Sequence, residues 1–220
     1  MKQNYEIILA SGSPRRRELL TQAGLSFRVK TADVDETPTK TKPEKVVEEL
    51  SRRKAEAVAE QILNEEGSFE LSASPRIIVA ADTIVAMDGE ILGKPRDTED
   101  AVRMLRELSG RTHEVYTGVT ILVPKDGKQE PESEADGRLS SWNCTFSSCT
   151  KVMFYPLSDE EILDYVASGE PMDKAGAYGI QGLGERLVER IEGDYNNVVG
   201  FPLSHFLRIL AKQGMITYEV

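Results

Sequence analysis

The sequence predicts an α/β protein built on a mixed sheet, and three observations support this prediction. Short apolar runs typical of strands alternate along the chain with segments of helical periodicity. The continuous apolar run 77–81 is typical of a strand that is buried on both faces. Asp88-Gly89 lies between the apolar segments 84–87 and 90–92, which is a strong hairpin signal. Because a hairpin pairs antiparallel strands, the sheet is not expected to be purely parallel.

The N-terminal third is expected to form a strand, a helix, a second strand and a long helix. Ser13 is a good N-cap residue. Pro14 fits the first helical position, because the N–H that proline lacks has no partner there. Gly24 is the expected stop of this helix. The expected bounds are 5–10 and 26–30 for the strands, and 14–24 and 43–63 for the helices.

The remaining chain continues the alternation around one polar interruption. Residues 125–148 are rich in Glu, Ser and Gly and lack periodicity, so we expect a mobile surface insertion that joins two strands. Ser158 and Glu161 have the spacing of a capping box. The further expected elements are helices at 98–108, 158–169 and 202–213, and strands at 115–123, 152–155 and 187–191.

Length and composition are those of one globular domain, 1–220, with room for two lobes. The net charge of −10 argues against nucleic acid as the main partner, although a basic pocket can exist on an acidic protein. No apolar stretch is long enough to span a membrane. The first residues lack the apolar core of a signal peptide, and Cys144 and Cys149 form neither a disulfide framework nor a zinc site. We therefore expect a cytoplasmic protein with free thiols.

The stretch from Ser11 to Arg17 places three arginines in the first turn of a helix. That turn is the positive end of the helix dipole, where cations are disfavoured. Either an anion such as phosphate docks on its free N–H groups, or the turn is solvated and partly neutralised by Glu18. The sequence leaves both interpretations open. Ser11 and Ser13 have no adjacent general base, which argues against a serine hydrolase.

Two acidic positions are candidates for metal or acid–base chemistry. Asp82 follows the buried run 77–81, at the strand end where ligands collect in α/β sheets. Its carboxylate holds a divalent cation, deprotonates a water or does both, or it only ends the strand. Asp35 and Glu36 add carboxylates, and Mg²⁺ takes one or two of these in many sites. Isolated acidic residues are more often solvated, so this pair alone is weak support.

Several lysines lie where they can reach a phosphate. Lys54 falls on the apolar stripe of the long helix, so its ammonium either extends to water or points into a site. Lys94 occupies the turn Gly93-Lys94-Pro95, and Lys174 begins a glycine-rich segment that also contains Gln181. Together with the arginine turn, four segments offer cations and two offer carboxylates. This combination suits phosphoryl or pyrophosphoryl chemistry, in which catalysis is positioning plus charge stabilisation.

Four stretches resemble the Maf family of nucleotide pyrophosphatases, and they occur in the family's order. They are Ile8-Leu9-Ala10-Ser11-Gly12-Ser13-Pro14-Arg15-Arg16, Ala81-Asp82-Thr83, Gly93-Lys94-Pro95, and Asp173-Lys174-Ala175-Gly176-Ala177-Tyr178-Gly179-Ile180-Gln181-Gly182. The resemblance covers nearly the whole chain, except the polar segment before Pro75 and the 125–148 insertion. It implies an ITPase-like (Maf/Ham1) fold, in which helices flank a mixed twisted sheet and two lobes enclose a central cleft. It also implies a homodimer.

The resemblance further implies hydrolysis of a nucleoside triphosphate to the monophosphate and pyrophosphate with a divalent cation, Mg²⁺, Mn²⁺ or Co²⁺. The segment 174–182 is similar to the branch that acts on dTTP and UTP, rather than the branch that acts on 7-methyl-GTP. Carried over by position, the catalytic residues would be Asp82, Lys54 and Lys94, and the metal ligands Glu36 and Asp82. The substrate-binding residues would be Ser11, Ser13, Arg15, Arg16, Thr83, Lys174 and Gln181, of which Arg15, Thr83 and Gln181 are linked to base selection.

Other functions remain open at this level. The cellular substrate could be a modified pyrimidine nucleotide, for which dTTP and UTP are proxies. A second class is a nucleotide-binding regulator of cell division or cell-cycle arrest that acts without turnover. The intact set of Asp82, Glu36 and Lys54 speaks against it, because a pure binder has little use for a base and metal ligands. A structural module with an incidental basic turn is the third alternative.

Overall fold

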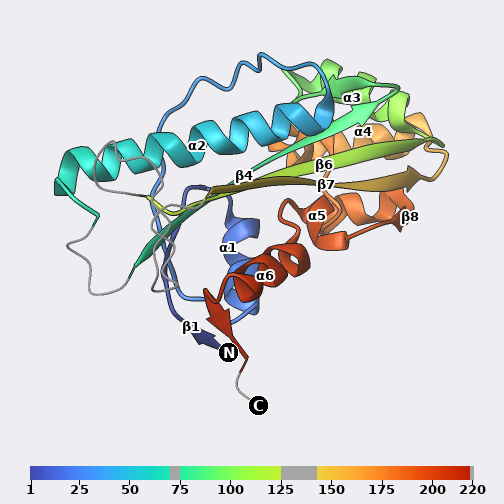
Figure 1. Cartoon of the computed structure of the whole chain (residues 1–220). Coiled ribbons are helices and arrows are strands. Elements are labelled where there is room, and N and C mark those ends of the chain that lie inside the picture. The colour runs from blue at the N-terminus through green and yellow to red at the C-terminus, as the bar shows by residue number, and fades with distance from the viewer. Residues whose placement is uncertain (70–74, 125–142, 219–220) are drawn as a thin grey trace.

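The computed structural model describes residues 1–69, 75–124 and 143–218, and a long mixed sheet dominates it (Figure 1). Within these ranges the main sheet has seven strands in the order β3-β2-β4-β6-β7-β8, and β5 pairs with β4. β2 runs parallel to β3 and β4, and the other pairs are antiparallel. The strands are β2 (Glu6–Leu9), β3 (Phe27–Val29), β4 (Arg76–Met87), β5 (Glu90–Leu92), β6 (Thr112–Leu122), β7 (Asn143–Phe154) and β8 (Val188–Glu192). The expected mixed α/β sheet is confirmed.

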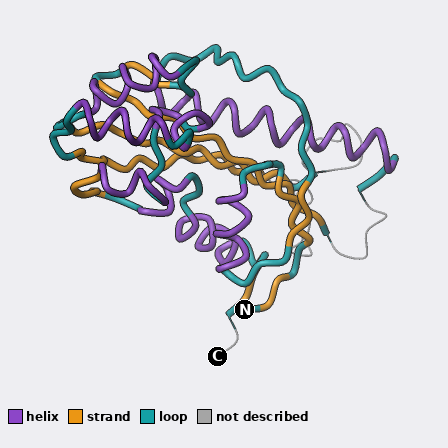
Figure 2. Tube along the Cα trace, turned by 180° about the vertical axis from the view of Figure 1, so that it is seen from behind, coloured by secondary structure: helices purple, strands orange, loops and turns teal. Residues whose placement is uncertain are grey.

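Helices cover both faces of this sheet. The long α2 (Pro43–Glu66) packs along β4, β6 and β7 on one face. The opposite face is covered at one end by α1 (Pro14–Gln22), α5 (Tyr195–Val199) and α6 (Leu203–Lys212), and at the other end by α3 (Thr98–Leu108) and α4 (Asp159–Ala167). Figure 2 shows the same arrangement from behind. A separate pair, β1 (Lys2–Gln3) and β9 (Ile216–Thr217), holds the two ends of the chain side by side.

Strand alternation decides which face each β4 side chain reaches, because successive side chains point to opposite faces. Ile77, Val79 and Ala81 belong to the apolar cluster under α1 and α6. Ile78 and Ala80 belong to the cluster under α2. Even-numbered residues therefore face α2, and odd-numbered residues face the other layer. By this rule the side chain of Asp82 points toward α2, and that of Thr83 points toward α1 and α5.

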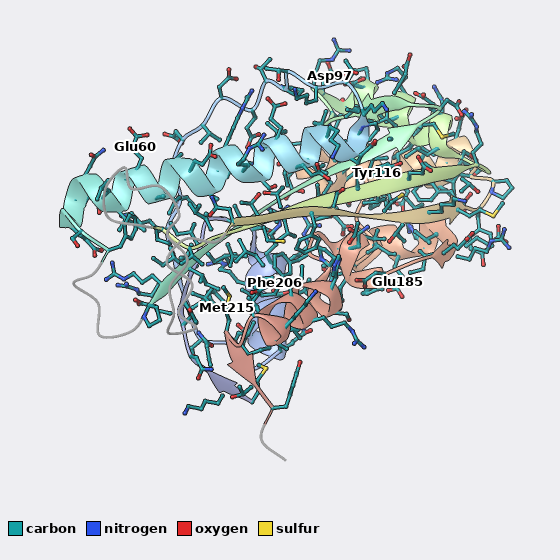
Figure 3. All side chains as sticks on the ribbon, in the orientation of Figure 1. Glu60, Asp97, Tyr116, Glu185, Phe206 and Met215 are labelled. Carbon is teal, nitrogen blue, oxygen red and sulfur yellow. The ribbon has the colours of Figure 1, made fainter. Side chains whose placement is uncertain are left out.

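The three long strands join two regions of core on the face opposite α2. β4, β6 and β7 contain 12, 11 and 12 residues, which corresponds to about 40 Å of extended chain. One cluster lies under α1 and α6 and contains Phe206 of α6, which is labelled in Figure 3. The other lies under α3 and α4 and contains Tyr165. Both clusters lie on the same face of one continuous sheet.

A glycine lets α2 approach the sheet closely. A Cβ built on Gly118 of β6 would lie 2.4 Å from the backbone carbon and oxygen of Val47. That distance is shorter than van der Waals contact, so only glycine fits between this strand and the helix without a shift. This close approach brings the side chains of α2 within reach of β4.

The structure corrects two expectations about strand boundaries. Asp82 does not end a strand, because β4 continues through it to Met87. Asn143–Ser148, expected within the insertion, belong to β7, where Thr145 bonds to Thr120 and Ser147 donates to Glu48. In both cases polar residues inside a strand find side-chain partners on neighbouring elements, so the ladder does not need to stop. The rest of the expected insertion, 125–142, lies outside the described residues.

Other local expectations are confirmed. α3 has the predicted bounds, and the hairpin turn uses Asp88 and Gly89 with φ of 52° and 85°. Ser158 and Glu161 form the predicted capping box at α4. Ser13 occupies the N-cap position of α1, but its side chain makes no capping hydrogen bond. Among the described residues, no helix is both long enough and apolar enough to cross a membrane.

Candidate active site

Lys54 joins two carboxylates that come from distant parts of the chain. Its Nζ lies 2.6 Å from Asp82 Oδ1 and 2.8 Å from Glu36 Oε1. Lys54 comes from the sheet side of α2, and Asp82 is the even-numbered β4 residue that alternation turns toward this helix. The Asp82 side chain is 13% exposed and that of Glu36 is 60% exposed, so the cluster reaches from the sheet to solvent. Lys54 thus points into a site rather than extending alone to water.

Glu36 lies in the segment between β3 and α2, which runs along α2 in both views (Figures 1 and 2). Arg53 of α2 donates to the carbonyls of Asp35 and Thr37, at 3.0 and 2.8 Å, and so grips both neighbours of Glu36. Glu49 holds Arg53 through a 2.6 Å ion pair. The hydrogen bond from Lys54 lowers the pKa of Glu36. The Asp35 carboxylate accepts from the Thr37 N–H instead of joining the site.

Arg16 is bonded to protein atoms on three sides. Its Nε donates to the Gly200 carbonyl at 2.8 Å, and its two terminal nitrogens bond to Ser11 Oγ and Thr83 Oγ1, each at 3.0 Å. Burial lowers the pKa of Arg16, and the nearby Asp82 charge partly opposes this. The Thr83 hydroxyl also pairs with Thr117 at 2.9 Å. Arg16 therefore ties the first turn of α1 to β4 and to the end of α5.

Arg15 lies against the glycine-rich segment instead. Its guanidinium is 3.9 Å from Asp173 and 3.4 Å from the position that a Cβ on Gly179 would take. Lys174 is beside it, with its Nζ donating to the Glu170 carbonyl at 2.5 Å and to Asp173 at 2.6 Å. The Lys174 ammonium is thus already hydrogen-bonded to protein oxygens. Arg15 keeps the freer guanidinium, with a side chain that is 29% exposed.

Lys94 completes the set of cations. Its charge contributes to lowering the pKa of Glu36, after the larger effect of Lys54. The neighbouring Gly93 carbonyl accepts from the Gly176 N–H at 3.0 Å, which holds the Lys94 turn against the glycine-rich segment. The Lys94, Lys54 and arginine-turn segments therefore meet around one pair of carboxylates.

A cavity of about 400 Å³ opens at this place. Arg16, Glu36 and Lys54 line it together with Ser11 and other residues of the β2–α1 and β3–α2 connections. The cavity lies where the parallel strands β2 and β3 end, which is the edge where ligands collect in such sheets. Gln181 is half-buried, and its side chain makes no hydrogen bond to the residues that the structure describes.

The carboxylates of Glu36 and Asp82 fit a hard divalent cation, most of whose ligands are supplied by water and by the substrate. Among the described residues there is no group of three or more His, Cys, Asp or Glu side chains that could hold a metal. Glu36 and Asp82 are two carboxylates that already share one positive charge, the Lys54 ammonium. Mg²⁺ commonly takes one or two carboxylates and completes its shell with waters and phosphate oxygens. The pair therefore suits a cation that arrives with a phosphate ligand.

Sequence reasoning missed the supporting residues, which fix the segments that carry the site residues. Glu49 and Arg53 fix the Glu36 segment, and Glu170 accepts three hydrogen bonds around the glycine-rich segment. Glu49 is only 7% exposed, yet it interrupts the apolar face of α2. The sequence did offer one signal for Glu49. It is an acidic residue beside the apolar stripe of a helix, and Arg53 follows four residues later, which is the spacing of a helical ion pair.

Comparisons with known proteins show which family this chain resembles. The family model described as Maf-like protein matches residues 6–213. A protein of Agathobacter rectalis named dTTP/UTP pyrophosphatase is 46% identical over 213 residues, which are 96% of this chain and 98% of that one. The protein of the same name from Desulfitobacterium hafniense is 48% identical, over 95% of this chain and 86% of its own. The solved structure of the Staphylococcus aureus Ham1 protein has a TM-score of 0.40 and 16% identity, over 68% of this chain and 71% of that one.

Proposed function

Because this chain belongs to the Maf-like protein family, we propose that it hydrolyses dTTP and UTP to the monophosphate and pyrophosphate. The relatives described above carry the name dTTP/UTP pyrophosphatase and match nearly the whole chain. The observation that supports the proposal most is Lys54 bonded to both Asp82 and Glu36 at the edge of a cavity that Arg16 and Lys54 help to line. Such a set of charges suits attack on a polyphosphate.

In this proposal Asp82 acts as the general base. Its carboxylate accepts the proton of a water that attacks the α-phosphorus, and the bond from that phosphorus to the bridging oxygen of pyrophosphate breaks. Lys54 fixes the orientation of Asp82 through their 2.6 Å contact. A base must lie within hydrogen-bond reach of the proton that it takes, so this orientation matters for rate.

Cationic side chains would stabilise the charge that develops on the leaving pyrophosphate. Arg15 and Lys94 are the best placed, because Arg16 and Lys174 are engaged by protein oxygens. Ser11 and Ser13 would donate from the β2–α1 connection to phosphate oxygens. Removal of one preorganised donor in such sites typically lowers kcat by about 10²–10³-fold.

Glu36 and Asp82 would hold a divalent cation, Mg²⁺, Mn²⁺ or Co²⁺. When bound, such an ion supplies positive charge to phosphate oxygens and lowers the pKa of a bound water. Arg15, Thr83 and Gln181 would select the base. A homodimer belongs to the same proposal, and sedimentation analysis of the full chain tests it separately.

The test compares two Asp-to-Asn variants of the same hairpin. Asp82→Asn removes the base, and Asp88→Asn makes the same change at an exposed turn residue. Release of pyrophosphate from dTTP and UTP is measured with Mg²⁺, Mn²⁺ and Co²⁺, and folding is checked by circular dichroism. We expect Asp82→Asn to lose at least about 10²-fold in kcat, while Asp88→Asn resembles the wild type. Turnover of folded Asp82→Asn at the wild-type rate would refute the assigned role, and an inactive wild type would refute the function.

A further inference from the structure

We propose that Glu170 is a positioning residue for base selection, which holds the segment 179–184 and with it Gln181. This inference rests on the proposed function, in which Gln181 reads the base of the nucleotide. Glu170 lies in a short 3₁₀ turn, Glu170–Asp173, directly after α4. Its role would be to fix where the reading side chain stands, without touching the substrate itself.

Three hydrogen bonds join the Glu170 carboxylate to its surroundings. Oε1 accepts from the Tyr165 hydroxyl at 2.9 Å and from the Gly184 N–H at 3.1 Å. Oε2 accepts from the Leu183 N–H at 3.0 Å. The Tyr165 oxygen also accepts from the Gly179 N–H at 3.2 Å. The segment is thus held at both ends, by Tyr165 before Gln181 and by Glu170 after it.

Glycines make this close approach possible. A Cβ on Gly184 would lie 2.3 Å from the Gly179 carbonyl oxygen and 2.6 Å from the Tyr165 hydroxyl. A Cβ on Gly182 would lie 2.8 Å from Glu170 Oε2, and the φ of 72° at Gly182 also disfavours any other residue. The segment therefore wraps around the Glu170 carboxylate with no room for side chains at these positions.

The environment favours the charged form of this carboxylate. Burial opposes it, but the N–H of Leu183, the Tyr165 hydroxyl and the N–H of Gly184 outweigh burial, and together they lower the pKa of Glu170. Hydrogen bonds to a charged acceptor are stronger than neutral ones. The contact is thus a firm support for the backbone around Gln181.

Glu170 also connects this segment to two cations that are expected to bind phosphate, Lys174 and Arg15. Its backbone carbonyl accepts from Lys174 Nζ, and the Lys174 Cε lies 2.8 Å from the position of a Cβ on Gly179. Arg15 approaches the same glycine from the α1 side. A displaced segment would therefore change the geometry of Gln181 more than that of Asp82, which β4 and α2 hold independently.

Loss of the support should change which base is accepted more than how fast the favoured one reacts. A site that hydrogen-bonds its substrate rejects analogues because its polar groups would otherwise be left unpaired. Rejection of the wrong base therefore requires that the Gln181 side chain is held in a fixed position. Once the segment moves freely, Gln181 can turn to suit other bases, and discrimination falls.

The experiment uses two variants and a matched control on the full chain. Glu170→Gln puts an N–H₂ group where one carboxylate oxygen accepted, and Tyr165→Phe removes the hydroxyl that links both ends. Glu185→Gln removes the same charge at an exposed residue directly after the segment 179–184, labelled in Figure 3. For each protein, kcat and KM are measured with dTTP, UTP and dCTP, which carries an amino group in place of the 4-oxo group. Hydrogen exchange of the amides in 179–184 and the Tm are measured in parallel.

We expect both variants to lower the ratio of kcat/KM for dTTP over dCTP by about 10-fold, with faster exchange in 179–184. Glu185→Gln should leave both quantities at wild-type values. An unchanged ratio in Tyr165→Phe and Glu170→Gln would overturn the inference, and so would equal losses for all three nucleotides. A wild type inactive on dTTP and UTP would overturn the proposed function and this inference with it. If Glu170→Gln does not fold, Tyr165→Phe decides.

Discussion

His113 should make the protein lose stability as the pH falls below about 6.5. The residue lies on β6 and is 1% exposed. Its Nε2 is 2.7 Å from the hydroxyl of Tyr178, in the glycine-rich segment, and its Nδ1 has no hydrogen-bond partner within the described part of the chain. Burial lowers the pKa of His113 from 6.5 to about 4. Between these two pH values His113 is therefore neutral in the folded protein and protonated in the unfolded chain.

The sign and size of the effect follow from the two pKa values. Between about pH 6.5 and 4 the unfolded chain binds more protons, so the free energy of unfolding decreases as the pH falls through this window. Each pKa unit corresponds to about 1.4 kcal/mol, which makes the full contribution of His113 about 3 kcal/mol at pH 4 and below. At pH 5 the contribution is about 2 kcal/mol relative to pH 7.5.

The assay is urea denaturation of three proteins at pH 7.5 and pH 5.0. His113→Gln removes the titrating ring and keeps a side chain that can bond to Tyr178. His205→Gln, which removes the other histidine of the chain from an exposed position, is the matched control. Carboxylates titrate in all three proteins, so their effect cancels in the comparison. We expect wild type and control to lose about 2 kcal/mol more than His113→Gln. An identical loss in all three would refute the reasoning.

Gly118→Ala should lower the free energy of unfolding by about 1–3 kcal/mol, because the added methyl meets the backbone of α2 at Val47. Gly93→Ala, with open space around its Cβ, is the control in the same urea titration, and equal stabilities would contradict the close packing. Arg53→Met should raise the Mg²⁺ concentration for half-maximal activity by about 10-fold, because the Glu36 segment loses its support. Arg52→Met controls for charge, and an equal shift in both would argue against that support.

Local patterns predicted most of the elements, and they failed where a polar group depends on a distant partner. The alternation of strands and helices, the Asp88-Gly89 hairpin and the bounds of α3 follow from neighbouring residues alone. The sequence places Asp82 at a strand end because it directly follows the apolar run 77–81. The structure neutralises it with Lys54, which is 28 residues away in the sequence. No local pattern specifies that contact.

The arginine turn shows the same limit. The residue pattern leaves open whether its charges meet an anion or water, and only the family resemblance separates Arg15 from Arg16. The structure separates them, because Arg16 donates to the carbonyl of Gly200, which is 184 residues away. Arg15 stays beside the glycine-rich segment. Sequence could identify the turn as a candidate site, but only the tertiary contacts tell which of its cations is free for a ligand.

The supporting residues were the hardest to foresee. Glu49, Arg53 and Glu170 belong to no motif recognised in the sequence, and each acts on a segment that carries a candidate functional residue. Their partners are mainly backbone N–H and carbonyl groups, which any residue provides. The sequence can mark such a residue as unusual, as it does for Glu49, but it does not identify the backbone groups that the residue contacts.

The position of the cleaved bond tests the account most directly. Wild-type protein is incubated with dTTP and a divalent cation in water enriched in ¹⁸O, and the products are separated and weighed by mass spectrometry. Attack on the α-phosphorus predicts one ¹⁸O atom in the monophosphate and none in pyrophosphate. Label in pyrophosphate, or release of a nucleoside diphosphate with labelled phosphate, would show that water attacks another phosphorus and would contradict the account.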